Sequence, residues 1–497
     1  MKKLIRILLK TVAVVSASYL LLLIPDAENN PSEKLKPNGH IPFFWNRDSL
    51  WQQTENNFRS ARRMPASQLD SIIENYQNSI TEKFDRISDS TLSAGDERLA
   101  AIENEFFNAA AYVAAKPAAM NWYLQYSNLL RSYIKIQSRQ WNVQDTAVKN
   151  NLYKLLYGIR AATEETMLQT GVYYEAAPAV TVQDEKSAAP FTTIFGVKVH
   201  SGDLLVSRGG AEVSALISRS NDYPGNFSHV ALIYIDEKDN HPYLIEAHIE
   251  KGVALSSVEQ YIADKKLRFM VLRLRSDLPA MQQDSLLPHK AAKQMFWAAQ
   301  RRHIPYDFKM NFYDSSALFC SEVASYAYKA KGIQLWQNSS TLSAPGVISW
   351  LHDFGVENFV TQMPSDLEYD PQLSIVAEWR DPETLYKDHM DNAAMDALLE
   401  QAGKGKEISY NHWMLPVARV IKAWCWIKNR FGKEGLIPEG MSATRALKNE
   451  TFVAMHNQVK AALLEQAALF EKQNGYKPPY WQLVKMAQET AEKVTGK

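Results

Sequence analysis

Two short segments carry side chains that could form a nucleophile and its base. Cys320 lies in Leu-Phe-Cys-Ser-Glu-Val-Ala, at the expected start of a helix, and His229 lies at the head of the strand pattern His-Val-Ala-Leu-Ile-Tyr. Unpaired backbone N–H groups and the positive end of a helix dipole favour a thiolate over a thiol. An imidazole at the end of a strand could accept the proton of such a thiol. The two segments together predict nucleophilic catalysis by a cysteine.

A third group should orient the imidazole. Glu246 lies on the strand that follows the His229 strand across a short turn, so hairpin pairing would bring its carboxylate to the ring. For the oxyanion, the backbone N–H of Cys320 is the expected donor, with Tyr306 as a further candidate. Ser321 adjoins the same helix start, where it could contact substrate or act as a nucleophile in place of Cys320, although a hydroxyl is less acidic than a thiol.

The hydrophobic pattern divides the chain into regions that must position these residues. Residues 27–48 are rich in proline and predict a linker, residues 49–170 show helical spacing, and residues 346–497 return to helical spacing. Between them, residues 171–345 predict an α+β catalytic domain with two helices, at 291–301 and 321–331. Its expected strands are 192–199, 203–207, 229–235, 241–247 and 269–274.

Five short blocks, in this order, resemble the permuted YiiX/YebB-like branch of the NlpC-type cysteine hydrolases. They are Gly202-Asp203, Ser228-His229-Val230, Glu246-Ala247, Pro305-Tyr306-Asp307 and Cys320-Ser321-Glu322. In ordinary NlpC-type enzymes the cysteine helix precedes the strands, whereas here it follows them. The resemblance covers about residues 199–345 and implies a circularly permuted papain-like fold with an antiparallel sheet. It also implies that Cys320, His229 and Glu246 are the catalytic residues.

Other side chains offer weaker candidates for chemistry. His241 and His248 flank Glu246 but lack the spacing of a metal site, so we expect neither a metal nor another cofactor. Cys425, in Trp-Cys-Trp within a helical pattern, is expected to be a buried and inert thiol. Lys plus Arg and Asp plus Glu number 55 each, so the chain has no net charge to attract nucleic acid.

The N-terminal residues predict export. Lys2, Lys3, Arg6 and Lys10 precede an uncharged run at residues 11–24. This pattern is typical of a signal peptide or an uncleaved membrane anchor within residues 1–26. We therefore expect a periplasmic or envelope protein, held at the inner membrane by residues 4–24 if these are retained.

Three functions fit this combination of residues. The first is hydrolysis of an amide bond, with peptidoglycan stem peptides as the expected substrate, because the resemblance coincides with an export signal. The second is lipid acyl transfer or hydrolysis, as in the lecithin–retinol acyltransferase-like enzymes, which share the order of histidine before cysteine. The third is an envelope scaffold without catalysis, in which Cys320 is a small buried residue that resists mild alkylation near neutral pH.

Overall fold

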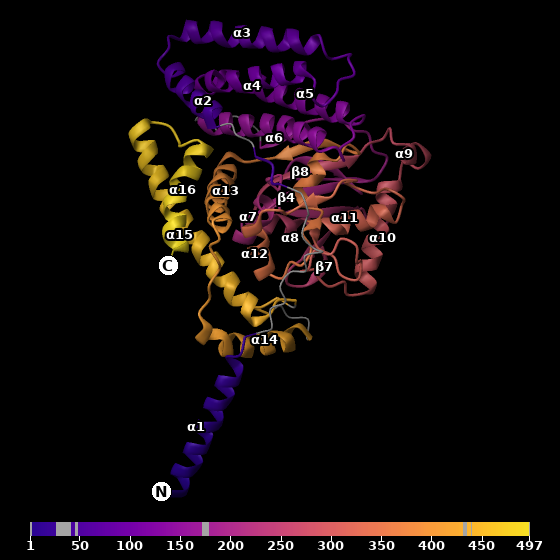
Figure 1. The fold of residues 1–497 in the computed structure, drawn as a ribbon. Coiled ribbons are helices and arrows are strands. Elements are labelled where there is room, and N and C mark those ends of the chain that lie inside the picture. Colours follow the sequence, from indigo (N-terminus) through magenta and orange to yellow (C-terminus); the bar gives the residue numbers. More distant parts are fainter. Residues whose placement is uncertain are drawn as a thin grey trace.

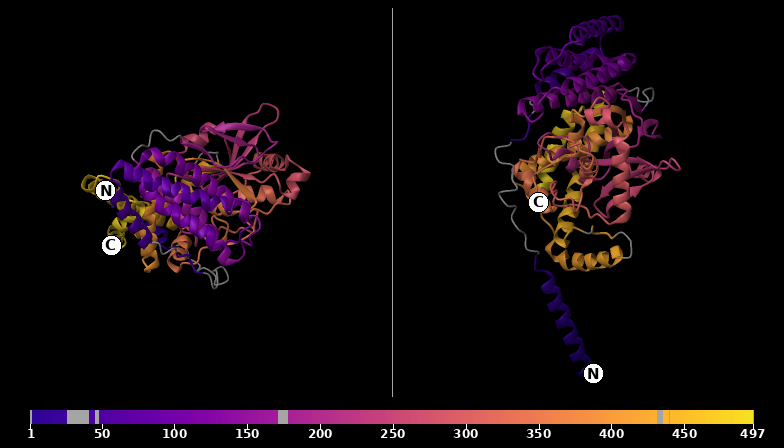
Figure 2. Two further views of the ribbon diagram at one scale, coloured as in Figure 1. Left: turned by 90° about the horizontal axis from the view of Figure 1, so that it is seen from above. Right: turned by 90° about the vertical axis from the view of Figure 1, so that its right-hand side faces the viewer.

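The computed structural model describes residues 2–25, 41–44, 48–170, 178–430, 435–438 and 440–496. Most of the expected linker at 27–48 lies outside these residues. Helix α1 (Lys2–Leu22) projects from one end of the molecule, and a helical bundle forms the opposite end (Figure 1; Figure 2). Among the described residues, no helix has both the length and the hydropathy expected of a membrane span.

The N-terminal bundle agrees with the predicted helical region at 49–170. Apolar residues recur every three or four positions, and one such row on α3 (Leu69, Ile73, Ile80 and Phe84) is buried against the neighbouring helices. Asp96 and Asp145 accept backbone N–H bonds at the starts of α4 and α6. The helices are α2 (Asp48–Ala61), α3 (Ala66–Asp85), α4 (Glu97–Ala115), α5 (Met120–Ser138) and α6 (Thr146–Gln169).

A seven-stranded antiparallel sheet forms the centre of the molecule, in the order β1-β11-β8-β4-β5-β6-β7. Side chains alternate between its faces. Leu204 and Val206 face α10 (Leu287–Arg301) and α11 (Cys320–Lys329), whereas Leu205 faces a hairpin and α8 (Val258–Ala263). The sheet strands are β1 (Ala179–Thr181), β4 (Leu204–Gly209), β5 (His229–Ile235), β6 (Pro242–His248), β7 (Gly252–Ser256), β8 (Lys266–Leu274) and β11 (Leu373–Trp379), and the hairpin is β2 (Phe191–Ile194) with β3 (Val197–His200).

Strand β11 corrects the predicted boundary of the catalytic domain at residue 345. The strand lies well beyond that residue, yet it pairs with both β8 and β1 inside the sheet. Pairing between strands a hundred residues apart leaves no local signal, so the helical pattern around it led to the wrong assignment. The catalytic domain therefore extends to about residue 379.

The C-terminal helices cover one end of the sheet and one side of the bundle (Figure 1). Helices α13 and α16 pack together with α15 around buried residues such as Met395, Val459 and Ala487. Helix α14 lies across the base of this group, beside α1. The remaining α-helices are α7 (Glu212–Arg219), α9 (Pro279–Gln283), α12 (Pro345–Asp353), α13 (Pro382–Gly403), α14 (Leu415–Arg430), α15 (Ala443–Asn474) and α16 (Tyr480–Thr495), and the remaining strands are the short β9 (Ser340–Thr341) and β10 (Val360–Thr361).

Candidate active site

His229 and Glu246 are neighbours across the β5–β6 hairpin. The register pairs Ala231 with Glu246, which places the glutamate diagonally opposite the first residue of β5. The Nε2 atom of His229 lies 2.8 Å from Oε2 of Glu246. The hydrogen bond predicted from hairpin pairing is therefore present. It leaves Nδ1 as the ring nitrogen that can accept a proton from another group.

The charge states of this pair suit a general base. Burial disfavours the carboxylate of Glu246, but the hydrogen bond from His229, with the nearby ring of His248 and the charge of Lys266, holds its pKa well below the usual range. Burial lowers the pKa of His229, and the bond with Glu246 opposes that shift only in part. Near neutral pH the site thus holds a carboxylate beside a neutral imidazole.

Cys320 is the first residue of α11 and faces the start of β5. Its thiol donates to the carbonyl oxygen of Ser228, with the sulfur 3.7 Å away, and this serine directly precedes the histidine base. The backbone N–H groups of Ser321, Val230 and Cys320 itself point at the sulfur. Among the described residues, no hydrogen bond joins Sγ of Cys320 to the ring of His229. The structure therefore brings nucleophile and base to one place without a direct bond between them.

The expectation that Cys320 is a thiolate is wrong for this state of the molecule. The residue is only 4% exposed, and burial raises the pKa of its thiol to about 12. The three backbone N–H groups lower the pKa of the thiol, as predicted, but burial away from solvent raises it by more. Slow alkylation near neutral pH is consequently expected of this closed state as well, so it does not distinguish an enzyme from a scaffold.

The segment at residues 302–319 approaches the cysteine through Tyr306. Tyr306 from this segment is close enough for the charges of its hydroxyl and the Cys320 thiol to interact, and its pKa is raised well above the usual range mainly by burial. The neighbouring Phe308 lies edge-on against Tyr306 and packs against the buried cluster of the C-terminal region that contains Ile437 and Met441. The C-terminal region therefore supports the segment that brings Tyr306 to the nucleophile.

The two residues after Cys320 have structural partners. The hydroxyl of Ser321 donates to the carbonyl oxygen of Gln362 at 2.8 Å, so its backbone N–H rather than its hydroxyl faces the sulfur. Glu322 accepts the backbone N–H of Phe319 at 2.9 Å, and burial raises its pKa to about 9. A neutral Glu322 spares the nucleophile an adjacent negative charge while holding the turn that presents it.

Reasoning from sequence missed the place of His248 in this cluster. Its Nε2 atom lies 3.6 Å from Oε1 of Glu246, and its ring centroid is 5.7 Å from that of His229. Residues two apart on a strand share a face, so the spacing of Glu246 and His248 was the available signal. No group of three or more metal-ligating side chains gathers anywhere in the described parts of the chain. Cys425 is buried and unbonded to Cys320, as expected.

Comparisons with known proteins agree with this geometry. Residues 198–377 match the model of a family described as "permuted papain-like amidase enzyme, YaeF/YiiX, C92 family". The matched segment begins in β3 and ends in β11, so it contains His229, Glu246 and Cys320. No curated protein and no solved structure matches the chain.

Proposed function

Because residues 198–377 belong to the permuted papain-like amidases, a family of cysteine hydrolases, we propose that this chain cleaves an amide bond in peptidoglycan stem peptides. The observation that carries the proposal is the hydrogen bond between His229 and Glu246 beside the start of the Cys320 helix. An orienting carboxylate, a neutral imidazole and a thiol are the groups that acyl transfer requires. The basic and apolar N-terminal segment supports a substrate in the cell envelope.

The reaction follows from the protonation states. Nδ1 of His229 takes the proton of the Cys320 thiol as sulfur attacks the amide carbon, and Glu246 stabilises the resulting imidazolium. Backbone N–H groups at the start of α11 are available to the oxyanion. The C–N bond then breaks, the imidazolium protonates the leaving amine, and water releases the acid from the thioester. A thiol with a raised pKa requires the base at the moment of attack rather than a preformed ion pair.

The decisive experiment compares the two cysteines. Full-length protein in detergent, incubated with purified peptidoglycan, should release peptide fragments with new amino termini that mass spectrometry detects. Cys320→Ala should release none. Cys425→Ala, which alters the other buried thiol, should release as much as the wild type. Equal release by the wild type and Cys320→Ala would disprove the proposal.

A second candidate function is acyl chemistry on a lipid, and an exposed apolar surface favours it. Helix α14 and the residues before it present Trp413, Val417, Val420 and Trp424 to solvent. Transfer or release of acyl chains from phospholipid by the wild type, lost in His229→Ala, would support this function if peptidoglycan is left intact.

The same surface supports attachment to a membrane. Helix α1 exposes Leu9, Val14 and Leu20, and its Tyr19 hydroxyl donates to the carbonyl of Trp413 beside α14. Residues 408–430 contain Arg and Lys but no Asp or Glu. Exposed tryptophan beside basic residues is typical of helices that lie in the interface of an anionic bilayer. We propose that α1 enters the bilayer and that α14 lies along its surface.

Vesicle binding tests this attachment. Full-length protein should sediment with vesicles of phosphatidylcholine and phosphatidylglycerol, and Val420→Asp should lower the bound fraction because a carboxylate opposes burial in lipid. Val14→Asp should lower it further. Trp297→Asp alters an exposed tryptophan site on α10 and should have no effect. Binding that is unchanged in both valine variants would contradict the proposed orientation.

A further inference from the structure

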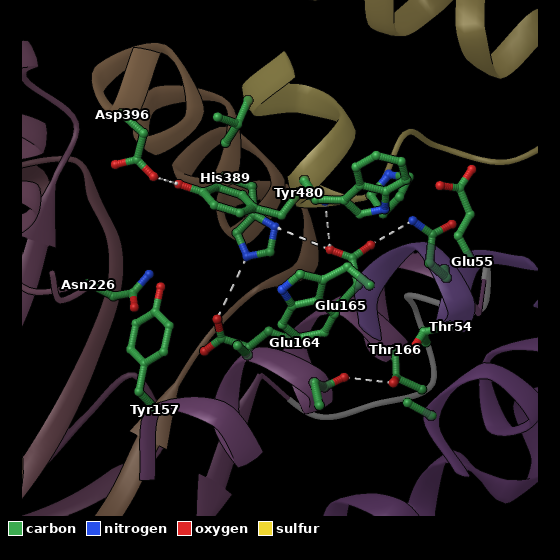
Figure 3. Close-up of a pocket in the computed structure, with 18 of the residues that line it drawn as sticks. Thr54, Glu55, Tyr157, Glu164, Glu165, Thr166, Asn226, His389, Asp396 and Tyr480 are labelled. Atoms are coloured by element: carbon green, nitrogen blue, oxygen red, sulfur yellow. Dashed lines mark hydrogen bonds and ion pairs between the residues drawn. The ribbon is translucent and has the colours of Figure 1, made fainter. Parts of the chain in front are cut away.

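A cavity of about 480 Å³ lies where the N-terminal bundle meets the C-terminal helices. Its walls come from α2, α4, α6, α13 and α16 and from the segment that precedes β5 (Figure 3). Cys320, His229 and Glu246 do not line it. Most of its lining also lies outside residues 198–377. The cavity is therefore separate from the amidase site, and its size is that of a pocket for a small molecule.

Aromatic rings form much of the wall. They include Trp51, Phe58, Tyr157, Tyr476, Tyr480 and Trp481. Such rings provide apolar contact area, and their faces attract cations. Lys485 already lies over the Trp481 ring, 4.6 Å from its centroid, so these rings serve mainly as contact area for the apolar body of a ligand.

Four carboxylates also line the cavity, and three of them are neutralised by arginine. Arg219 binds Asp396 through two bonds of 2.7 and 2.9 Å, and Arg268 binds Glu164 at 2.7 Å. The third, Glu55, accepts a bond of 2.7 Å from Arg59. These three carboxylates are already paired within the protein, so their charges are not available to a ligand.

Glu165 is the carboxylate that differs. It accepts bonds from two neutral donors, Nε2 of Gln169 at 2.8 Å and the backbone N–H of Tyr480 at 3.2 Å. Among the described residues no Arg or Lys pairs with it, and the only basic group within 4.0 Å is the ring of His389. Figure 3 shows His389 between Glu165 and Glu164. The negative charge of Glu165 therefore remains available to a ligand.

Beside Glu165, the buried Oε1 atom of Gln169 also has no hydrogen-bond partner. Leaving a buried polar atom unpaired costs about 1–3 kcal/mol, so such atoms in a cavity wall indicate a missing partner. The amide oxygen of Gln169 is an acceptor, like the carboxylate next to it, and the two together match a group that donates several hydrogen bonds.

We propose that this cavity binds an organic amine with an aromatic or aliphatic body. The ammonium group donates to Glu165 and to Oε1 of Gln169, and the body packs against Trp481 and the neighbouring rings. A ligand carboxylate in the same place would face the charge of Glu165, which no Arg or Lys of the described residues neutralises, so binding of anions of equal size is disfavoured.

Three probes that share an indole body but differ in their head group test the proposal. Calorimetry with the full-length protein should give the tightest binding for tryptamine, binding about tenfold weaker for the uncharged alcohol tryptophol, and none for indole-3-propionate. Glu165→Gln keeps a hydrogen-bond acceptor but removes the negative charge, so it should lower the affinity for tryptamine to that for tryptophol. Trp481→Ala should weaken the binding of tryptamine and of tryptophol by the same factor.

The controls separate this site from others. Glu82→Gln alters an exposed glutamate on α3 and should bind tryptamine as the wild type does. Cys320→Ala should also bind normally, because the amidase site is elsewhere. Equal affinity for the three probes, or a preference for tryptamine that persists in a folded Glu165→Gln protein, would overturn the proposal.

Discussion

A variant with alanine at both Cys320 and His229 should be no slower than either single variant. The two side chains act in one step, since the imidazole takes the proton of the thiol as the sulfur attacks, and burial disfavours the thiolate that attack without a base would need. Each single change should therefore lower kcat by on the order of 10⁴- to 10⁶-fold, and the second change should add little. The measurement is the rate at which the wild type, the two single variants and the double variant release peptide from peptidoglycan. If the loss of kcat in the double variant equalled the product of the two single losses, the residues would act independently.

The role of Glu246 can be separated from that of the base through the pH profile. His229 must be neutral to accept a proton, and its pKa is lowered by burial, so the acidic limb of kcat/KM should lie below pH 6.5. Glu246→Gln removes the carboxylate that opposes this shift. The limb should move to still lower pH while kcat falls by about 10²- to 10⁴-fold. Glu259→Gln, on the exposed side of α8, should change neither quantity.

The local parts of the site could be predicted from sequence. Strand β5 begins and ends at the predicted residues, and the hairpin that follows it brings Glu246 to His229 as its position in the strand implied. Such pairing depends on neighbouring elements and on the alternation of side chains, which short segments record. The helix start at Cys320 is local in the same way.

Features that depend on distant segments could not be predicted. The pKa of Cys320 is set by its burial, and the segment that brings Tyr306 to it is held through Phe308 by residues more than a hundred positions later. Strand β11 joins the sheet from outside the predicted domain. The cavity around Glu165 requires α2, α6 and α16 to meet, and no motif in the sequence marks that meeting. Burial and tertiary contact decide these properties, and a local pattern does not contain them.

A buried ion network joins the N-terminal bundle to the sheet. Arg131 on α5 donates two bonds, of 2.9 and 2.7 Å, to Glu378 on β11. Arg160 on α6 binds Glu368, which lies 3.5 Å from Arg131 as well. All of these side chains are almost completely buried. Because water cannot replace a lost partner there, breaking one pair leaves an uncompensated charge in the interior.

Glu378→Gln should therefore lower the free energy of unfolding by about 3–5 kcal/mol at neutral pH. Burial opposes the ionisation of Glu378, but Arg131 and Arg380 together lower its pKa to about 2. A carboxyl with a depressed pKa contributes stability that is present above its unfolded value of 4.5 and is lost as pH falls towards 2. The difference between wild type and variant should accordingly shrink across that window, as urea unfolding followed by circular dichroism would measure. Glu82→Gln breaks an exposed pair with Arg86 and should cost about 0.5 kcal/mol or less at any pH. A similar small cost for Glu378→Gln would mean that the network does not hold the bundle to the sheet.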